Sequence, residues 1–260
     1  MSEVHIYTVP ADFAANANAD KAKYEAMYKA SVEDNEAFWA EEGKRIDWIK
    51  PYTKVKDVSF DSPVSIKWYQ DGTLNASANC LDRHLSRRAN QTAIIWEPDS
   101  PQDEALHITY KELYDKTNRM ANVLKDLGVT KGDRVILYLP MIPEAAYAML
   151  ACARIGAVHS VVFGGFAAAE LATRINDCNP KLIVSSSCGI EPGRVIAYKP
   201  LLDEAIELAT VKPVGTIVLQ REQVAAEMKA GYDHDWQAEV DSVRAAGRQA
   251  GCVAVKATDP

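Results

Sequence analysis

The sequence lacks closely paired cysteines, which excludes two common ways of stabilising a small fold. Its five cysteines are scattered over 260 residues, whereas a disulfide framework or a zinc site needs pairs at short spacing. We therefore expect reduced thiols, packed as small hydrophobic side chains, in a cytoplasmic protein. No apolar segment of the kind found in signal peptides follows Met1. The longest apolar run, residues 145–153, is too short to cross a bilayer.

Basic residues are fewer than acidic residues. The 29 lysines and arginines are outnumbered by 36 acidic residues, which gives a net charge of −7. A nucleic-acid-binding protein needs a basic face to neutralise phosphates, so we expect no nucleic-acid partner. A small anionic ligand is still possible, because a few arginines in a pocket suffice to bind it. Hydrophobic residues make up 48% of the chain, as is ordinary for a soluble globular protein large enough to bury a core.

The familiar catalytic motifs are missing. The sequence contains no Gly-x-x-x-x-Gly-Lys-Ser/Thr loop, no Gly-x-Gly-x-x-Gly, no Gly-x-Ser-x-Gly and no His-Glu-x-x-His. The five histidines show no metal-ligand spacing and no carboxylate partner that the sequence can justify, so we interpret them as structural. The residues taken by themselves therefore predict no catalytic constellation.

The elements that are present divide the chain into two regions. Residues 1–106 form an irregular, aromatic-rich leader, with four of the five tryptophans by position 96. It includes expected helices over 20–29 and 75–88, and a further helix that Ser31 or Asp34 could cap. Residues 107–260 alternate strands with helices, which predicts parallel βαβ units and an α/β fold. The expected strands are 134–139, 158–163, 181–185 and 216–219, and the expected helices are 109–127, 143–155, 168–177, 201–208 and, on the surface, 232–247.

Two glycine-containing segments follow predicted strands. The first is the turn Phe163-Gly164-Gly165-Phe166, and ligands of open α/β sheets bind at this edge, where glycines let them approach the backbone. The second spans residues 188–200 and carries Arg194 and Lys199, of which the arginine suits phosphate oxygens. A tight strand-to-helix turn and a solvated loop are the alternatives, and the residues alone leave both open. Within the helix 143–155 we expect Arg154 to pair with a carboxylate at the rim of the core.

Several segments resemble AMP-forming acetyl-CoA synthetases of the adenylate-forming superfamily. They are residues 65–75, 80–84, 92–97, 138–144 and 148–166, and the similarity extends along the chain from Tyr24. The resemblance implies the N-terminal portion of the large α/β domain of such an enzyme. It also implies the substrates acetate, ATP and CoA, with Mg²⁺, and a reaction in two steps. Acetate and ATP form acetyl-adenylate and pyrophosphate, and the CoA thiol then displaces AMP.

The resemblance also implies a CoA site in this chain. Phe163, Gly164 and Gly165 are expected beside the CoA adenine, and Ile196 is expected to pack on that base. The 191–194 segment is expected to meet the phosphorylated ribose, with Arg194 as its cation. The acetate branch usually has a basic residue where this chain has Glu191, so one cation is lost. The complete set of expected cofactor-binding residues is Phe163, Gly164, Gly165, Glu191, Pro192, Gly193, Arg194 and Ile196.

We expect no catalytic or metal-binding residue in this chain. By the resemblance, the ATP site, the Mg²⁺-linked carboxylate and the catalytic lysine follow residue 260, so the remainder of its own chain is the expected partner. Residues 188–206 instead resemble propionyl-CoA synthetases, which keeps propionate open as the substrate. A stand-alone, non-enzymatic CoA-binding module is the further alternative, and no membrane association is expected.

Overall fold

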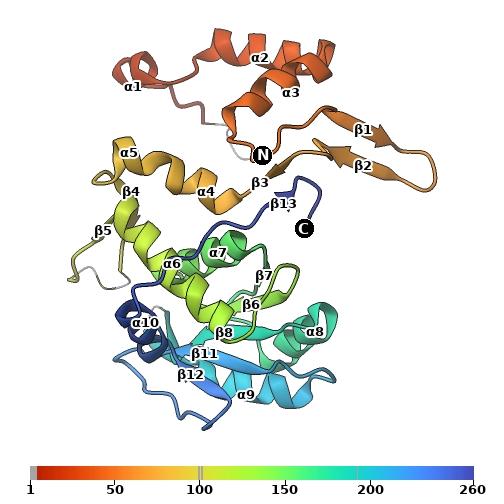
Figure 1. Cartoon of the computed structure of the whole chain (residues 1–260). Coiled ribbons are helices and arrows are strands. Elements are labelled where there is room, and N and C mark those ends of the chain that lie inside the picture. Colours follow the sequence, from red (N-terminus) through yellow and green to blue (C-terminus); the bar gives the residue numbers. More distant parts are fainter. Residues whose placement is uncertain (1–4, 99, 101, 192) are drawn as a thin grey trace.

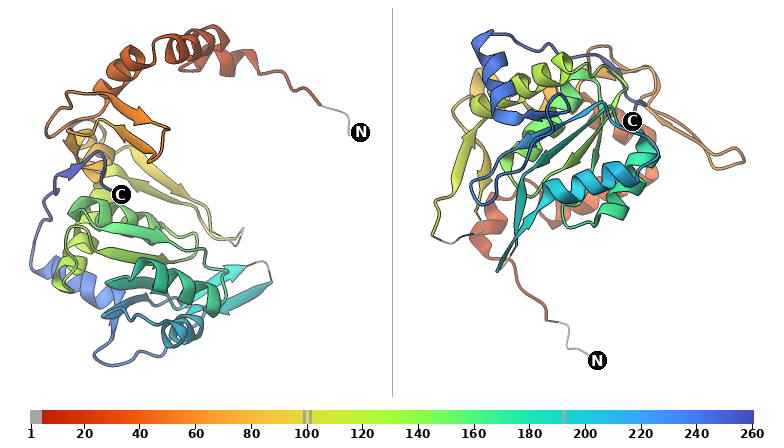
Figure 2. Two further views of the ribbon diagram at one scale, coloured as in Figure 1. Left: turned by 90° about the vertical axis from the view of Figure 1, so that its right-hand side faces the viewer. Right: turned by 90° about the horizontal axis from the view of Figure 1, so that it is seen from below.

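The computed structural model describes residues 5–98, 100, 102–191 and 193–260 (Figures 1 and 2). An N-terminal run of short helices and hairpins precedes a region in which helices and parallel strands alternate. The N-terminal helices lie at one end of the molecule, away from the sheet (Figure 2). Within the described part of the chain, no helix is both long and apolar enough to cross a membrane.

A five-stranded parallel sheet organises the second region, as the alternation of strands and helices predicted. The strands lie in the order β12-β11-β8-β6-β7, and each neighbouring pair is parallel. Every residue of the central strand β8 is buried, because helices cover both faces of the sheet. The bounds are Arg134–Tyr138 (β6), Val158–Val161 (β7), Leu182–Ser186 (β8), Gly215–Leu219 (β11) and Asp233–Asp235 (β12).

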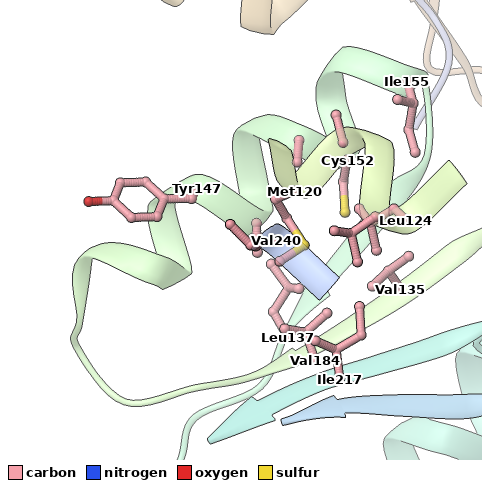
Figure 3. Packing of buried hydrophobic residues seen from close by; sticks show 14 of the residues in the cluster. Met120, Leu124, Val135, Leu137, Tyr147, Cys152, Ile155, Val184, Ile217 and Val240 are labelled. Atoms are coloured by element: carbon pink, nitrogen blue, oxygen red, sulfur yellow. The ribbon is translucent and has the colours of Figure 1, made fainter. Parts of the chain in front are cut away.

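The two faces of the sheet form separate cores because successive side chains of a strand point to opposite faces. Val135 and Leu137 of β6 pack under one layer of helices, whereas Ile136 and Tyr138 pack against the other. Figure 3 shows the first core, with Met120, Leu124 and Cys152 above the strand residues. The first layer comprises α6 (Tyr110–Asp126), α7 (Pro143–Ile155) and α10 (Trp236–Ala245), and the second comprises α8 (Ala168–Cys178) and α9 (Tyr198–Leu208).

The local signals that predicted α6 and α7 are confirmed. Thr109 Oγ1 accepts from the Glu112 amide, and the Glu112 carboxylate accepts from the Thr109 amide, which completes the expected capping box. Pro143 stands at the start of α7, and Gly156 ends that helix in the left-handed region with φ +73°. These signals fix where α6 begins and where α7 begins and ends.

The leader consists of short elements. As expected, Asp34 caps the helix that carries Phe38 and Trp39, and an aromatic cluster of Trp39, Trp48, Tyr52, Trp68 and Tyr69 packs nearby. The helices and strands that precede α6 are Ala11–Asn16 (α1), Lys21–Glu33 (α2), Asn35–Glu42 (α3), Gly43–Arg45 (η1), Lys56–Ser59 (β1), Ser65–Trp68 (β2), Thr73–Leu74 (β3), Ala76–Cys80 (α4), Asp82–His84 (η2), Leu85–Arg88 (α5), Thr92–Trp96 (β4) and Leu106–Thr109 (β5). Strand β3 pairs with β13 (Val255–Lys256) near the C-terminus.

The single helix expected over residues 75–88 is wrong. The chain leaves helical geometry at Leu81, with φ −122° and ψ −68°, and continues as η2 and α5. The side chain of Leu81 is fully buried in the first core. Next to it, Asp82 accepts two hydrogen bonds from Arg154, at 2.7 and 2.9 Å. Tertiary contacts therefore break the helix, and the expected carboxylate partner of Arg154 is confirmed.

The surface helix expected over residues 232–247 is also corrected. Its first residues form the edge strand β12, and α10 begins only at Trp236. Trp236, Val240 and Val243 are buried in the first core rather than exposed. Three polar residues, Asp233 to Asp235, carry no strand periodicity, so only pairing with β11 reveals this strand.

Candidate functional site at the carboxyl edge of the sheet

Both glycine-containing segments lie at the carboxyl ends of parallel strands. The turn 163–166 follows β7, and a hairpin follows β8. A cavity of about 170 Å³ lies between them. Of the expected site residues, Phe163, Gly164, Gly165 and Glu191 line this cavity. Its other lining residues are Leu139, Pro140, Met141, Ile142, Ile190, Tyr198 and Arg221.

The segment 188–200 is a hairpin rather than the loop that the sequence suggested. Strands β9 (Cys188–Glu191) and β10 (Arg194–Ala197) pair antiparallel, with Glu191 opposite Arg194. Gly193 takes a positive φ of +77° at the tip, which glycine adopts without strain. Pro192, an expected site residue, lies outside the described residues. The expected helix over 201–208 begins earlier, at Tyr198, directly after the hairpin.

Arg194 already has an anionic neighbour. Its Nε and Nη2 donate to the same oxygen of Glu191, at 2.9 and 2.6 Å. The Arg194 side chain is 69% exposed and that of Glu191 is 37% exposed, so water screens the pair. The hairpin tip therefore presents an exposed guanidinium whose charge a carboxylate offsets, and a phosphate ligand would compete with that carboxylate.

Two further side chains of this segment, Ile196 and Lys199, make contacts within the protein. Ile196 packs against the second core, together with Ile136 and Tyr138. Lys199, considered beside Arg194 as a second cation, is buried and binds Asp203 and Asp233 at 2.7 and 2.8 Å. Burial lowers the pKa of Lys199, but the hydrogen bonds to Asp203 and Asp233 outweigh burial and raise it above the ordinary value. Lys199 thus anchors α9 to the edge strand and does not reach the cavity.

Two stacked tyrosines, Tyr138 and Tyr198, pack against the turn 163–166. The Tyr138 hydroxyl donates to the carbonyl oxygens of Gly164 and Phe166, at 3.2 and 2.9 Å. The ring of Tyr138 stacks on Tyr198 with centroids 5.0 Å apart. Burial raises the pKa of Tyr138 to about 12, so its hydroxyl remains a donor at neutral pH. Phe163 is 68% exposed beside this supported backbone and offers a flat apolar surface to a ligand.

Sequence reasoning missed Tyr198 and Arg221 at this site. The Arg221 amide donates to Ser187 Oγ at 2.8 Å, and its Nη1 donates to the Cys188 carbonyl at 3.2 Å, which ties the segment after β11 to the hairpin. Tyr198 lies in the second glycine-containing segment but carries no signal of its own there, and Arg221 lies outside both segments, so no local pattern singled them out. They come together only because the carboxyl ends of β7, β8 and β11 meet at the same edge of the sheet.

A larger cavity, of about 510 Å³, opens beside the first and shares Arg221 with it. Glu144, in the first turn of α7, lines this cavity, and burial raises the pKa of its carboxyl. Lys116 is a further charged residue in the lining. This edge of the sheet therefore carries two adjoining hollows with charged residues of both signs.

Metal-ligating side chains and histidines are the remaining candidate groups. Among the residues that the structure describes, no three His, Cys, Asp or Glu side chains gather so as to hold a metal ion. His234 Nδ1 lies 3.0 Å from Glu239, a partner that the sequence did not reveal. That pair begins in β12, at the opposite edge of the sheet from β7. It lies outside the candidate site.

The fold and its edge cavity are those of an open α/β protein whose candidate site lies at the carboxyl ends of the strands. Residues 81–257 match the family described as AMP-binding enzyme, and residues 24–80 match the one described as acetyl-coenzyme A synthetase N-terminus. The first match alone covers more than half of the chain, which therefore belongs to the AMP-binding enzyme family.

Individual relatives agree with this assignment. Acetyl-coenzyme A synthetase from Parvibaculum lavamentivorans is 57% identical over 236 residues, which cover 90% of this chain and 36% of that protein. The acetyl-coenzyme A synthetase from Vibrio vulnificus is 50% identical, covering 91% of this chain and 35% of that protein. The resemblance that the sequence motifs indicated is thus confirmed, and the chain spans about a third of the length of the curated relatives it matches.

A solved structure shows the same fold. Acetoacetyl-CoA synthetase from Streptomyces lividans superposes with a TM-score of 0.77 at 24% identity, covering 96% of this chain and 37% of that chain. This similarity confirms the expected α/β architecture of adenylate-forming enzymes.

Proposed function

We propose that this chain is part of an AMP-forming acetate–CoA ligase and supplies the surface that faces CoA. Acetate would attack the α-phosphorus of ATP to give acetyl-adenylate and release pyrophosphate. The sulfur of CoA would then attack the acetyl carbon and release AMP. Membership of the AMP-binding enzyme family, together with the cavity between Gly164 and Glu191, is the observation that carries this proposal.

The chain's own residues would bind CoA rather than perform the chemistry. Phe163 offers an exposed ring against which a flat purine can stack, and the backbone of Gly164 and Gly165 borders the cavity. Gly193 lets the hairpin turn so that Arg194 stands at its tip. We assign Arg194 to a phosphate of CoA because a guanidinium matches phosphate oxygens with paired donors. No step is assigned to Mg²⁺, since the described residues contain no group of side chains fit to hold it.

The proposal is tested by Arg194→Ala in the full-length ligase. Losing one exposed charged contact is worth about 0.5–1.5 kcal/mol, so the KM for CoA should rise about two- to tenfold. Exchange of pyrophosphate into ATP should not change, because only the second step uses CoA. Arg244→Ala, at an exposed arginine of α10, is the matched control. An equal loss in exchange and in thioester formation would show that the hairpin acts structurally, and would refute the assignment.

Propionate is the second candidate substrate, because residues 188–206, which include the hairpin and the start of α9, resemble propionyl-CoA synthetases. The curated relatives named above are acetyl-coenzyme A synthetases, which favours acetate. Thioester formation measured with each acid in turn decides between them. If kcat/KM is higher for propionate than for acetate, propionate is the substrate, and the proposed CoA-binding residues stay the same.

A further inference from the structure

Tyr198 lies where the two segments of the candidate CoA site meet. A Cβ atom added to Gly164, in the turn after β7, would lie 2.2 Å from the Tyr198 hydroxyl oxygen. One added to Gly189, in the hairpin, would lie 2.4 Å from the same oxygen. Both distances are far below van der Waals contact, so only glycine at these positions leaves room for the phenol. The Tyr198 side chain thus reaches between the backbone of the turn and that of the hairpin.

The hydroxyl of Tyr198 is the unusual part of this arrangement. The residue is 5% exposed and lines the 170 Å³ cavity. Among the described residues, this hydroxyl forms no hydrogen bond, whereas the stacked Tyr138 donates to two carbonyl groups. The hydroxyl is therefore available to a partner that arrives with a ligand in the cavity.

The frame around Tyr198 is rigid. Its ring stacks on Tyr138, and its amide donates to the Ser187 carbonyl at 2.9 Å. The next residue, Lys199, is fixed by buried ion pairs to Asp203 and Asp233. Because the ring has little freedom to turn away, its hydroxyl stays between Gly164 and Gly189, at the edge of the cavity that Tyr198 lines.

We propose that Tyr198 is a ligand-binding residue of this site, whose hydroxyl donates a hydrogen bond to an acceptor atom of bound CoA. This inference rests on the proposed function, since it takes CoA as the occupant of the cavity. It gives Gly164 and Gly189 a shared purpose, which is to make room for the phenol in both walls. It also makes Tyr198, rather than Lys199, the residue by which the start of α9 contributes to binding.

The test is Tyr198→Phe in the full-length ligase, which removes the hydroxyl and keeps the ring. We expect the KM for CoA to rise about three- to tenfold, as for the loss of one hydrogen bond. The kcat and the exchange of pyrophosphate into ATP should stay at the wild-type level. Tyr232→Phe is the matched control, because its hydroxyl bonds to the Pro213 carbonyl away from the cavity. That control should leave the KM for CoA unchanged.

The outcomes separate this inference from the proposed function. If Arg194→Ala raises the KM for CoA and Tyr198→Phe does not, the hydroxyl contacts no ligand and this inference is overturned. If neither change affects the KM for CoA while pyrophosphate exchange persists, CoA does not bind here and the proposed function fails at this site. A fall in kcat and in exchange, together with a lower midpoint of thermal unfolding, would make Tyr198 purely structural and would also overturn the inference.

Discussion

Replacing Glu191 by glutamine should strengthen the binding of CoA. In the free protein Arg194 donates twice to one oxygen of Glu191, at 2.9 and 2.6 Å, and a phosphate must displace that carboxylate or share the arginine with it. Glutamine keeps the shape of the side chain and removes its charge. The change therefore frees the guanidinium and also removes a negative charge from beside the bound phosphate.

Two contributions set the size of the effect. Both side chains of the pair are more than a third exposed, and such pairs stabilise by about 0–1 kcal/mol. The repulsion between the Glu191 carboxylate and a phosphate about 5 Å away in water adds roughly 1 kcal/mol per unit charge before salt screens it. Together they amount to about 1–2 kcal/mol, which corresponds to a KM for CoA about five- to thirtyfold lower.

The assay compares CoA with dephospho-CoA, which lacks the ribose phosphate, as the thiol substrate of the full-length ligase. Glu191→Gln should lower the KM for CoA and leave that for dephospho-CoA nearly unchanged, and added salt should reduce the difference. Glu204→Gln, an exposed carboxylate of α9, is the matched control and should alter neither. An equal improvement for both thiols, or none for CoA, would refute the reasoning.

Two further predictions concern stability, measured as the free energy of unfolding in urea. Gly164→Ala should destabilise the chain by about 1–3 kcal/mol, because its Cβ would lie 2.2 Å from the buried Tyr198 hydroxyl. Gly165→Ala should cost less than about 0.5 kcal/mol, since it meets only the exposed ring of Phe163; equal costs would contradict the packing described. Asp233→Asn should destabilise by about 3 kcal/mol at neutral pH because it leaves Lys199 with one buried carboxylate fewer. Although burial raises the pKa of Asp233, hydrogen bonds from Lys199 and Thr216 hold it below the ordinary value. This stabilisation is therefore complete above about pH 4 and lost as the pH falls further, so the difference between wild type and variant should shrink on acidification; a pH-independent difference would refute it.

The parts of the fold that could be predicted from sequence are those with local causes. The capping box at Thr109 and the proline and glycine that bound α7 depend on residues within one helical turn of each other, and each lies where it was expected. The errors have non-local causes. Leu81 leaves helical geometry while its side chain is buried in the first core, and β12 exists because β11 lies beside it.

The candidate site likewise combines features with local sequence signals and features that depend on residues distant in sequence. The strand-to-helix turn at Gly164 was expected because glycines directly after a strand form a local pattern. The hairpin was mistaken for a loop, because its register depends on the pairing of Glu191 with Arg194 rather than on alternation in strands of four residues. In sequence, Lys199 is a second cation near Arg194, and only the contact with Asp233 of the edge strand shows that its charge is used inside the protein.

The two neighbouring glycines of the turn show why residue type alone does not define a ligand site. From the sequence, Gly164 and Gly165 had the same explanation, namely clearance for a flat ligand. In the structure, a side chain at Gly164 is excluded by the protein itself, through Tyr198, whereas one at Gly165 meets only the movable ring of Phe163. Clearance for a ligand therefore explains Gly165 better than Gly164. Gly164 instead contributes by leaving room for Tyr198, the side chain that lines the cavity.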